Sequence, residues 1–253
     1  MTLAVDRCSK QTLWCLGIGS SLLAFACAPE ARTLPSGVRV EVLRRGTGDA
    51  ASAGRYGVAD YRLEVGGKTL DSTEWHGEPW VFCQSDDKLL PGLRAGIEGI
   101  RAGETRRIVI PPEQAYGSAG KLPQIPPKST LIYEFTVLQW FSTSTSGCQY
   151  RVLKNSDRSP PEQGDQCVLR YRVFHPATAR ELDSSNKQGR ALEFELGSGT
   201  VLEIIEEMVA QIPCGASWQV AVPRDRTDEL SRSLDLLPRS SDLLIELELV
   251  GVR

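Results

Sequence analysis

The stretch AYGSAGKLPQIPPKSTLIYEF, from Ala115 to Phe135, decides the fold of this chain. It opens with a Tyr-Gly turn and continues to an apolar residue bounded by prolines, Ile125 before Pro126-Pro127. An alternating strand that carries aromatic residues, predicted over 131–138, follows at short spacing. Together these features indicate a turn-rich domain built around a β-sheet.

The residues upstream supply the rest of one domain. Strands are predicted over Val38–Leu43, Val58–Val65, Leu70–Thr73 with Trp80–Cys83 (one strand interrupted by a bulge or loop around Trp75–Glu78), and Arg107–Ile110. The Gly66-Gly67 pair is a hairpin signal after the second of these strands. Apolar residues at 90, 93, 97 and 100 have the spacing of an amphipathic helix over Leu90–Ile100. Antiparallel strands wrapped around one short helix make an α+β domain.

The second half of the chain repeats the first. A shift of 112 residues aligns residues 69–138 with 181–250 without a gap, at about one identical position in five. Leu70-Asp71-Ser72 then falls on Leu182-Asp183-Ser184, and a shift of 110 places Tyr61 on Tyr171. We interpret this as a tandem duplication of a whole domain.

Composition limits the classes of function. The 253 residues, with 41% hydrophobic and 24% charged residues, suit a globular protein of two domains. A net charge of −3 argues against broad affinity for nucleic acid. The basic pairs Arg44-Arg45 and Arg106-Arg107 are isolated, and we interpret them as solvated surface.

The N-terminus has the pattern of a targeting segment, predicted over 1–27. Arg7 and Lys10 precede the apolar stretch Leu13–Ala26, which is short for a membrane span. Cys27 directly follows small residues, as in a bacterial lipoprotein signal, in which this cysteine is acylated and attaches the protein to the membrane. Simple secretion and an uncleaved anchor are the alternatives. Each places the folded part outside the cytoplasm.

Four cysteines remain after this segment: Cys83, Cys148, Cys167 and Cys214. A bridge among the last three and buried free thiols are equally compatible with the sequence. No CxxC motif occurs, and His76 and His175 are the two histidines. We therefore expect no metal and no cofactor.

The stretch from about Gly37 to Trp140 resembles the FKBP family of peptidyl-prolyl isomerases. The resemblance is carried by the opening stretch together with Tyr61, Leu70-Asp71-Ser72 and Trp80-Val81-Phe82. It implies two FKBP-like domains, each an antiparallel sheet around a short helix. The predicted organisation is a signal at 1–27, a tether at 28–36, a first domain at 37–141, a linker at 142–147 and a degenerate second domain at 148–253.

The resemblance also implies a site in the first domain. It assigns Asp71, Tyr116 and Tyr61 to the polar, catalytic part, with the Tyr116 hydroxyl and the Leu90 amide donating to substrate carbonyls. It assigns an apolar substrate cleft to Trp80, Phe82, Leu89, Leu90, Leu93, Ile125 and Tyr133. Each of these residues also has a plain structural interpretation, as core or turn. Leu93 stands where the family often has tryptophan, which predicts weaker proline binding.

The second domain keeps Tyr171, Asp183 and Phe194 but departs elsewhere. Leu192, Asp228 and Ile245 stand at the positions of Trp80, Tyr116 and Tyr133, and the loop 224–239 is charged. We predict that this copy is catalytically inert and serves in packing, in binding client chains or in pairing subunits.

The predicted function is cis–trans isomerisation of X-Pro bonds in unfolded or nascent polypeptides of the bacterial cell envelope or periplasm. This reaction needs no nucleophile, metal or cofactor, since a dry apolar cleft favours the twisted amide. The alternative is a chaperone or scaffold that binds proline-containing segments without catalysis.

Overall fold

The computed structural model describes residues 30–145, 147–176, 180–223, 226 and 242–253. The predicted signal segment 1–27, with Cys27, lies outside the described residues. Within these described ranges, no helix is long and apolar enough to cross a membrane.

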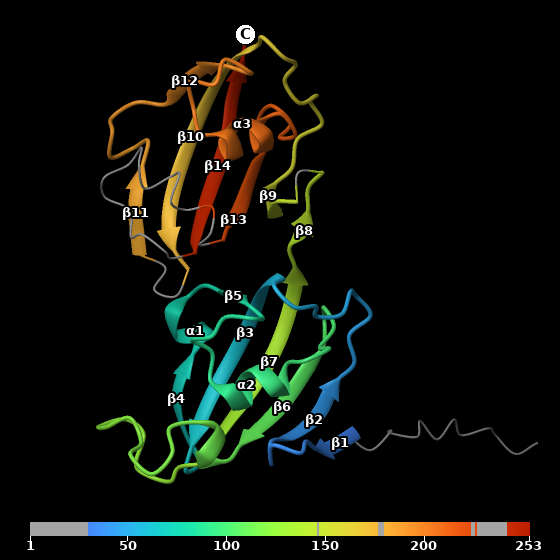
Figure 1. Cartoon of the computed structure of the whole chain (residues 1–253), viewed down its shortest axis with the longest axis vertical. Helices are drawn as coiled ribbons and strands as arrows, with labels where there is room; N and C mark the ends of the chain where they lie inside the picture. The colour runs from blue at the N-terminus through green and yellow to red at the C-terminus, as the bar shows by residue number, and fades with distance from the viewer. Residues whose placement is uncertain (1–29, 146, 177–179, 224–225, 227–241) are drawn as a thin grey trace, which may run out of the picture.

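The first half forms a seven-stranded antiparallel sheet in the order β1-β2-β6-β7-β3-β4, with β5 also paired to β3 (Figure 1). Its elements are β1 (Glu30–Thr33), β2 (Arg39–Arg44), β3 (Tyr56–Val65), β4 (Lys68–Ser72), α1 (Thr73–His76), β5 (Trp80–Cys83), α2 (Pro91–Gly96), β6 (Thr105–Ile110), the 3₁₀ turn η1 (Pro112–Gln114) and β7 (Leu131–Trp140). Gly66 and Gly67, with φ of 57° and 76°, make the tight turn between β3 and β4.

The second half forms another seven-stranded sheet, in the order β8-β9-β13-β14-β10-β11 with β12 on β10. Its elements are β8 (Ser142–Thr143), β9 (Gln149–Lys154), β10 (Gln166–His175), β11 (Arg180–Ser184), β12 (Leu192–Glu195), α3 (Glu203–Val209), β13 (Ser217–Val222) and β14 (Leu243–Val252). Strand for strand this is the topology of the first sheet. The predicted α+β fold of two antiparallel sheets with short helices is thereby confirmed.

The strand registers agree with the sequence duplication. In the first sheet Ala59 pairs with Trp80, and in the second Leu169 pairs with Leu192. These partners are related by the same shifts of 110 and 112 residues that align the two halves of the sequence.

Two segments that the sequence predicts as connectors are partly strands. Residues 30–33 of the predicted tether pair with β2 as β1, and residues 142–143 of the predicted linker pair with β9 as β8. Each adds an edge strand at the same place in its sheet. The polar composition of both segments is compatible with this position, because one side of an edge strand faces water.

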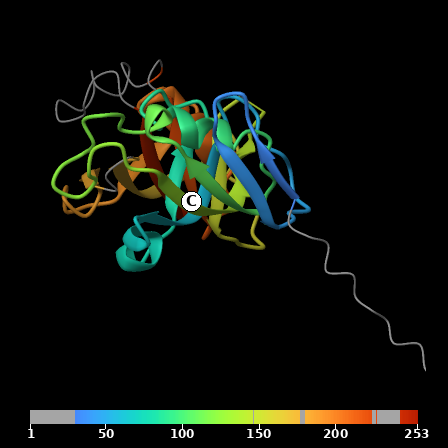
Figure 2. The ribbon, with the colours of Figure 1, turned by 90° about the horizontal axis from the view of Figure 1, so that it is seen from below.

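Other predicted elements differ in detail. Helix α1 begins at Thr73, the last residue of a predicted strand, and covers the first part of the loop expected around Trp75–Glu78. Ser72 caps it by accepting a hydrogen bond from the Glu74 amide at 3.0 Å. Seen along the long axis, α1 stands out from the edge of the first sheet (Figure 2). The four described cysteines are free thiols, so the bridge among Cys148, Cys167 and Cys214 does not form in this structure.

Helix α2 lies very close to β6, and this contact depends on glycine. A Cβ atom at Gly92 would overlap Ile110, and one at Gly96 would overlap Ile108. The helix ends against Arg106, whose guanidinium donates to the carbonyl oxygens of Gly96 and Glu98 at 2.9 and 2.8 Å.

The interpretation of Arg106 as solvated surface is wrong. The residue is 5% exposed and pairs with buried Glu104, with Nε 2.6 Å from Oε1. On β6 it has the same parity as Ile108 and Ile110, which also point into the core. The alternation along the strand therefore indicated that Arg106 is buried, in spite of its charge.

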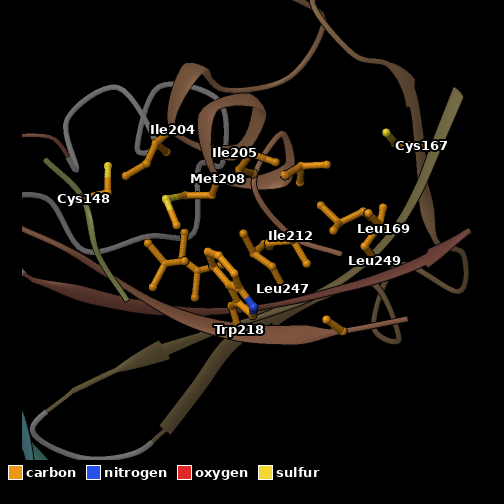
Figure 3. Packing of buried hydrophobic residues seen from close by; sticks show 14 of the residues in the cluster. Cys148, Cys167, Leu169, Ile204, Ile205, Met208, Ile212, Trp218, Leu247 and Leu249 are labelled. Carbon is orange, nitrogen blue, oxygen red and sulfur yellow. The ribbon is translucent and has the colours of Figure 1, made fainter. Parts of the chain in front are cut away.

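The core of the second domain is filled differently. Ile204 and Met208 stand at the positions of Gly92 and Gly96, and their side chains occupy the space between α3 and the sheet (Figure 3). Trp218 stands at the position of Arg106 and stacks on Tyr150, with ring centroids 4.2 Å apart. An apolar core thus replaces the buried ion pair of the first domain.

The two domains share a small apolar contact. Phe141, fully buried, lies with Tyr56, Val58, Val81, Ala221 and Leu244 in one cluster. Gln149 of the second domain accepts a hydrogen bond from the Tyr56 amide and donates to the Gly54 carbonyl, at 2.8 and 2.7 Å. This contact places the second sheet beside β5 and α1 of the first domain (Figure 1).

Candidate functional site

A cavity of about 620 Å³ opens at the side of the first domain that faces the second. Its lining includes eight of the ten predicted site residues of this domain, namely Tyr61, Asp71, Trp80, Leu89, Leu90, Leu93, Tyr116 and Tyr133. They come from β3, β4, β5, the start of α2, the turn after η1, and β7. The other seven follow Tyr61 by between 10 residues, for Asp71, and 72 residues, for Tyr133. They therefore meet only through the closure of the sheet around α2.

Aromatic rings form one wall of the cavity. The Tyr61 and Trp80 rings meet edge to face at 5.6 Å between centroids, and the Tyr61 and Tyr133 rings lie 6.1 Å apart. Leu93, 3% exposed, also lines the cavity. Such a wall repels water and leaves few partners for polar groups of a bound chain.

Phe82 and Ile125 do not line this cavity. Phe82 is 3% exposed and packs behind Trp80, with ring centroids 5.4 Å apart. Ile125, 5% exposed, belongs to the same core cluster. Alternation on a strand places Trp80 and Phe82 on one face, but it does not say which of them reaches the surface of that face.

Asp71 is held by three donors. The Tyr61 hydroxyl donates to Oδ2 at 2.7 Å, and the Ser72 amide donates to Oδ1 at 2.9 Å. His76 Nε2 lies 2.8 Å from Oδ1, and since an ionised carboxylate only accepts, this nitrogen carries the hydrogen. The carboxylate is therefore fixed at the cavity wall.

Burial by itself would raise the pKa of Asp71, but the hydrogen bonds from Tyr61, His76 and the Ser72 amide outweigh it and hold the pKa below its usual value. Burial, followed by the hydrogen bond to Asp71, raises the pKa of Tyr61 above the ordinary tyrosine value. At neutral pH the pair is thus a carboxylate and a neutral phenol, which can orient a dipole but transfers no proton.

His76 is the site residue that sequence reasoning missed. The sequence places it five positions after Asp71, in a segment predicted as an irregular loop. Helix α1 turns that segment back, so that the imidazole reaches the carboxylate. The available signal in the sequence was Ser72, because serine is a preferred residue at the start of a helix.

Tyr116 and Leu90, which both line the cavity, each carry a hydrogen-bond donor, a side-chain hydroxyl and a backbone amide respectively. Tyr116 lies in the turn after η1, and the Lys121 ammonium lies 5.6 Å from its ring centroid. Among the described residues no acceptor pairs with the amide of Leu90, which precedes α2 and lines the cavity. An unpaired backbone donor at a cavity wall is suited to a ligand carbonyl.

The second domain keeps the carboxylate–phenol pair. The Tyr171 hydroxyl donates to Asp183 Oδ2 at 3.0 Å, and Gln188 donates to the other oxygen at 3.3 Å. Asp183 is 3% exposed, and burial, followed by this carboxylate, raises the pKa of Tyr171 to about 12. Ile245, at the position of Tyr133, is fully packed, and Asp228 lies outside the described residues.

Comparison with known proteins agrees with this geometry. A family model described as FKBP-type peptidyl-prolyl cis-trans isomerase matches residues 48–138 and again residues 157–250. The FKBP-type peptidyl-prolyl cis-trans isomerase FkpA of Escherichia coli (strain K12) is 36% identical over 115 residues, which are 45% of this chain and 42% of that protein. The isomerase Mip of Chlamydia pneumoniae is 33% identical over 106 residues, 42% of this chain and 39% of that protein.

The chain thus spans less than half the length of these curated relatives. A crystal structure of the three FKBP domains of wheat FKBP73 aligns with 88% of this chain and 99% of that chain, at a TM-score of 0.50 and 16% identity. At this identity the likeness shows the fold alone.

Proposed function

The chain belongs to the family of FKBP-type peptidyl-prolyl cis-trans isomerases, and from this premise we propose that its first domain catalyses rotation about X-Pro bonds. The observation that carries the proposal is one cavity with an aromatic wall, an unpaired backbone donor at Leu90 and the fixed Asp71–Tyr61 pair. The substrates are proline-containing segments of unfolded or nascent polypeptides.

The mechanism follows from the chemistry of the amide. Rotation of an X-Pro bond is slow because it interrupts amide resonance, at a cost of about 18–20 kcal/mol. The twisted amide has less charge separation than the planar one, so contact with the apolar side of the cavity, which Trp80, Leu93 and Tyr133 form, stabilises it relative to the planar state. The Tyr116 hydroxyl and the Leu90 amide fix the flanking carbonyls while the bond turns.

Asp71 acts in this mechanism through its charge and its position. Three donors already occupy the carboxylate, so it does not move toward the substrate. Its negative charge at the wall orients the carbonyl dipole of the bound imide and holds the Tyr61 ring against Trp80. Its depressed pKa keeps that charge present at every pH near neutrality.

The cellular setting is part of the proposal. The pattern of residues 1–27, with basic residues, an apolar stretch and Cys27, supports export to the bacterial envelope and attachment through acylated Cys27. In that setting the clients are exported proteins whose slow folding step is proline isomerisation, which takes tens of seconds uncatalysed.

The test is a proline-isomerisation rate measured by NMR exchange on a short peptide with the full chain, with Tyr116→Phe, and with Tyr150→Phe as a control outside the cavity. We expect acceleration by the parent and the control. Loss of the hydroxyl donor should lower kcat/KM about three- to tenfold. A folded parent that does not accelerate exchange would overturn the catalytic proposal and favour a proline-binding chaperone or scaffold.

A further inference from the structure

The cavity of the first domain has a second wall, which the second domain provides. Its lining includes Arg151, Arg172, Phe174, Pro176, Gln219, Leu244 and Glu246. Apart from Pro176, these residues lie on β9, β10, β13 and β14, on the face of the second sheet that points away from its own core. A chain bound beside Trp80 would therefore pass along a face of the degenerate copy.

A row of hydrogen bonds crosses this face. Arg172 and Gln219 both donate to Glu246, each at 3.2 Å, and Arg151 donates through Nε to the Gln219 carbonyl oxygen at 2.8 Å. The strand register places these four side chains directly opposite one another on four neighbouring strands. Gln219, only 5% exposed, is locked between its two neighbours. These hydrogen bonds fix the orientation of each side chain in the row relative to its neighbour.

The two cations of the row are balanced differently. Arg172 pairs with carboxylates on both sides, Glu181 at 3.0 Å and Glu246 at 3.2 Å. Arg151 has no carboxylate within 4.0 Å among the described residues; its partners are the Gln219 amide and the face of the Phe141 ring. Burial lowers the pKa of this guanidinium, while Glu246 and Glu78 act in the opposite sense. A partly buried cation at a cavity wall with donors to spare is suited to an incoming carboxylate.

We propose that the outer face of the second sheet is the far wall of the peptide groove, and that Arg151 binds the carboxylate of an Asp or Glu side chain near the proline of the bound polypeptide. The inference rests on the proposed function, since it takes a proline-containing segment as the occupant of the cavity. It gives the degenerate domain a part in substrate selection without any catalytic group of its own.

The test measures peptide affinity, which does not depend on turnover. Isothermal titration with the full chain uses heptapeptides with one central proline, in which Glu or Gln is placed in turn at each flanking position. We expect one position at which the Glu peptide binds about three- to tenfold more tightly than its Gln counterpart, as for a charge-assisted hydrogen bond that is partly screened.

Two variants and one control test whether Arg151 causes the preference for the Glu peptide. Arg151→Gln should abolish it, while Arg151→Lys, which keeps the charge, should retain part of it. Arg170→Gln is the matched control, because Arg170 lies exposed on β10, near Glu248, and does not line the cavity. Equal binding of Glu and Gln peptides at every position, or a preference that survives Arg151→Gln, would overturn the inference.

Isomerisation rates on the same peptides separate this inference from the proposed function. A chain that shows the Glu preference but does not accelerate exchange supports the role of Arg151 and overturns catalysis. A chain that accelerates exchange equally on Glu and Gln peptides, without a difference in affinity, overturns only the inference. Failure of every peptide to bind overturns both.

Discussion

The two domains hold the same Asp–Tyr pair in different surroundings. In the first, Asp71 is half-exposed at a cavity and also contacts His76; in the second, Asp183 is 3% exposed and closed off by Gln188. The hydrogen bond survives in both copies, so it is a feature of the fold that satisfies a carboxylate on this strand. What distinguishes a candidate site is the open cavity beside the pair.

The cores beneath the two helices differ as well. Glu104 and Arg106 form a buried ion pair that binds the end of α2, whereas Ala216 and Trp218 occupy the same positions beside α3. In the first domain, the buried charges of Glu104 and Arg106 must stay paired with each other. The second fills the volume with apolar side chains, as Figure 3 shows, and removes that requirement.

The largest expected effect concerns this ion pair. Arg106→Ala should destabilise the first domain by about 3–5 kcal/mol, because it leaves Glu104 charged and buried without a partner. Guanidinium unfolding of the full chain, followed by fluorescence, measures it. Arg107→Ala, on the exposed side of the same strand, is the control and should change stability by less than about 0.5 kcal/mol. Equal costs for both variants would contradict the structural contrast between the domains.

A smaller effect is expected at the duplicated carboxylates. Asp71→Asn should lower kcat/KM about tenfold, since it removes the charge at the cavity. Asp183→Asn should leave kcat/KM unchanged and cost about 1–3 kcal/mol of stability, because that group is buried away from any substrate. The exchange assay and an unfolding curve on both variants decide this. Comparable losses of activity would mean that the second pair also serves catalysis.

The smallest effect is the pH dependence of Asp71. Its folded pKa is depressed, so its ionisation stabilises the folded state above the unfolded pKa of about 3.9, and this contribution is lost as pH falls from there through the folded value. Because the group is half-exposed, the effect should be small. Because Asp71 stays ionised between pH 7 and about pH 5, its titration should not change the activity in this range. The difference in the free energy of unfolding between the parent and Asp71→Asn should shrink as the pH falls from 5 to 3. A difference that stays constant over this range would rule out the depressed pKa.

Much of the fold could be predicted because its signals are local. Alternation, glycine turns and the repeat between the two halves depend on residues within one strand or on a constant shift, and each strand predicted in the first domain is present in the structure. The site residues came from the resemblance to the FKBP family, and eight of the ten that it implies line the cavity. Neither the resemblance nor the alternation along the strand distinguished Trp80, which lines the cavity, from Phe82, which packs behind it, because both residues have the same parity on β5.

The sequence by itself determined the duplication, the faces of the strands and the types of residue available at the first cleft. Tertiary structure alone decided that His76 meets Asp71, that the outer face of the second sheet closes the cavity with Arg151, and that the connectors at 30–33 and 142–143 become edge strands. The physical reason is that periodicity within a segment fixes which side chains share a face, whereas the meeting of two faces depends on how the segments pack.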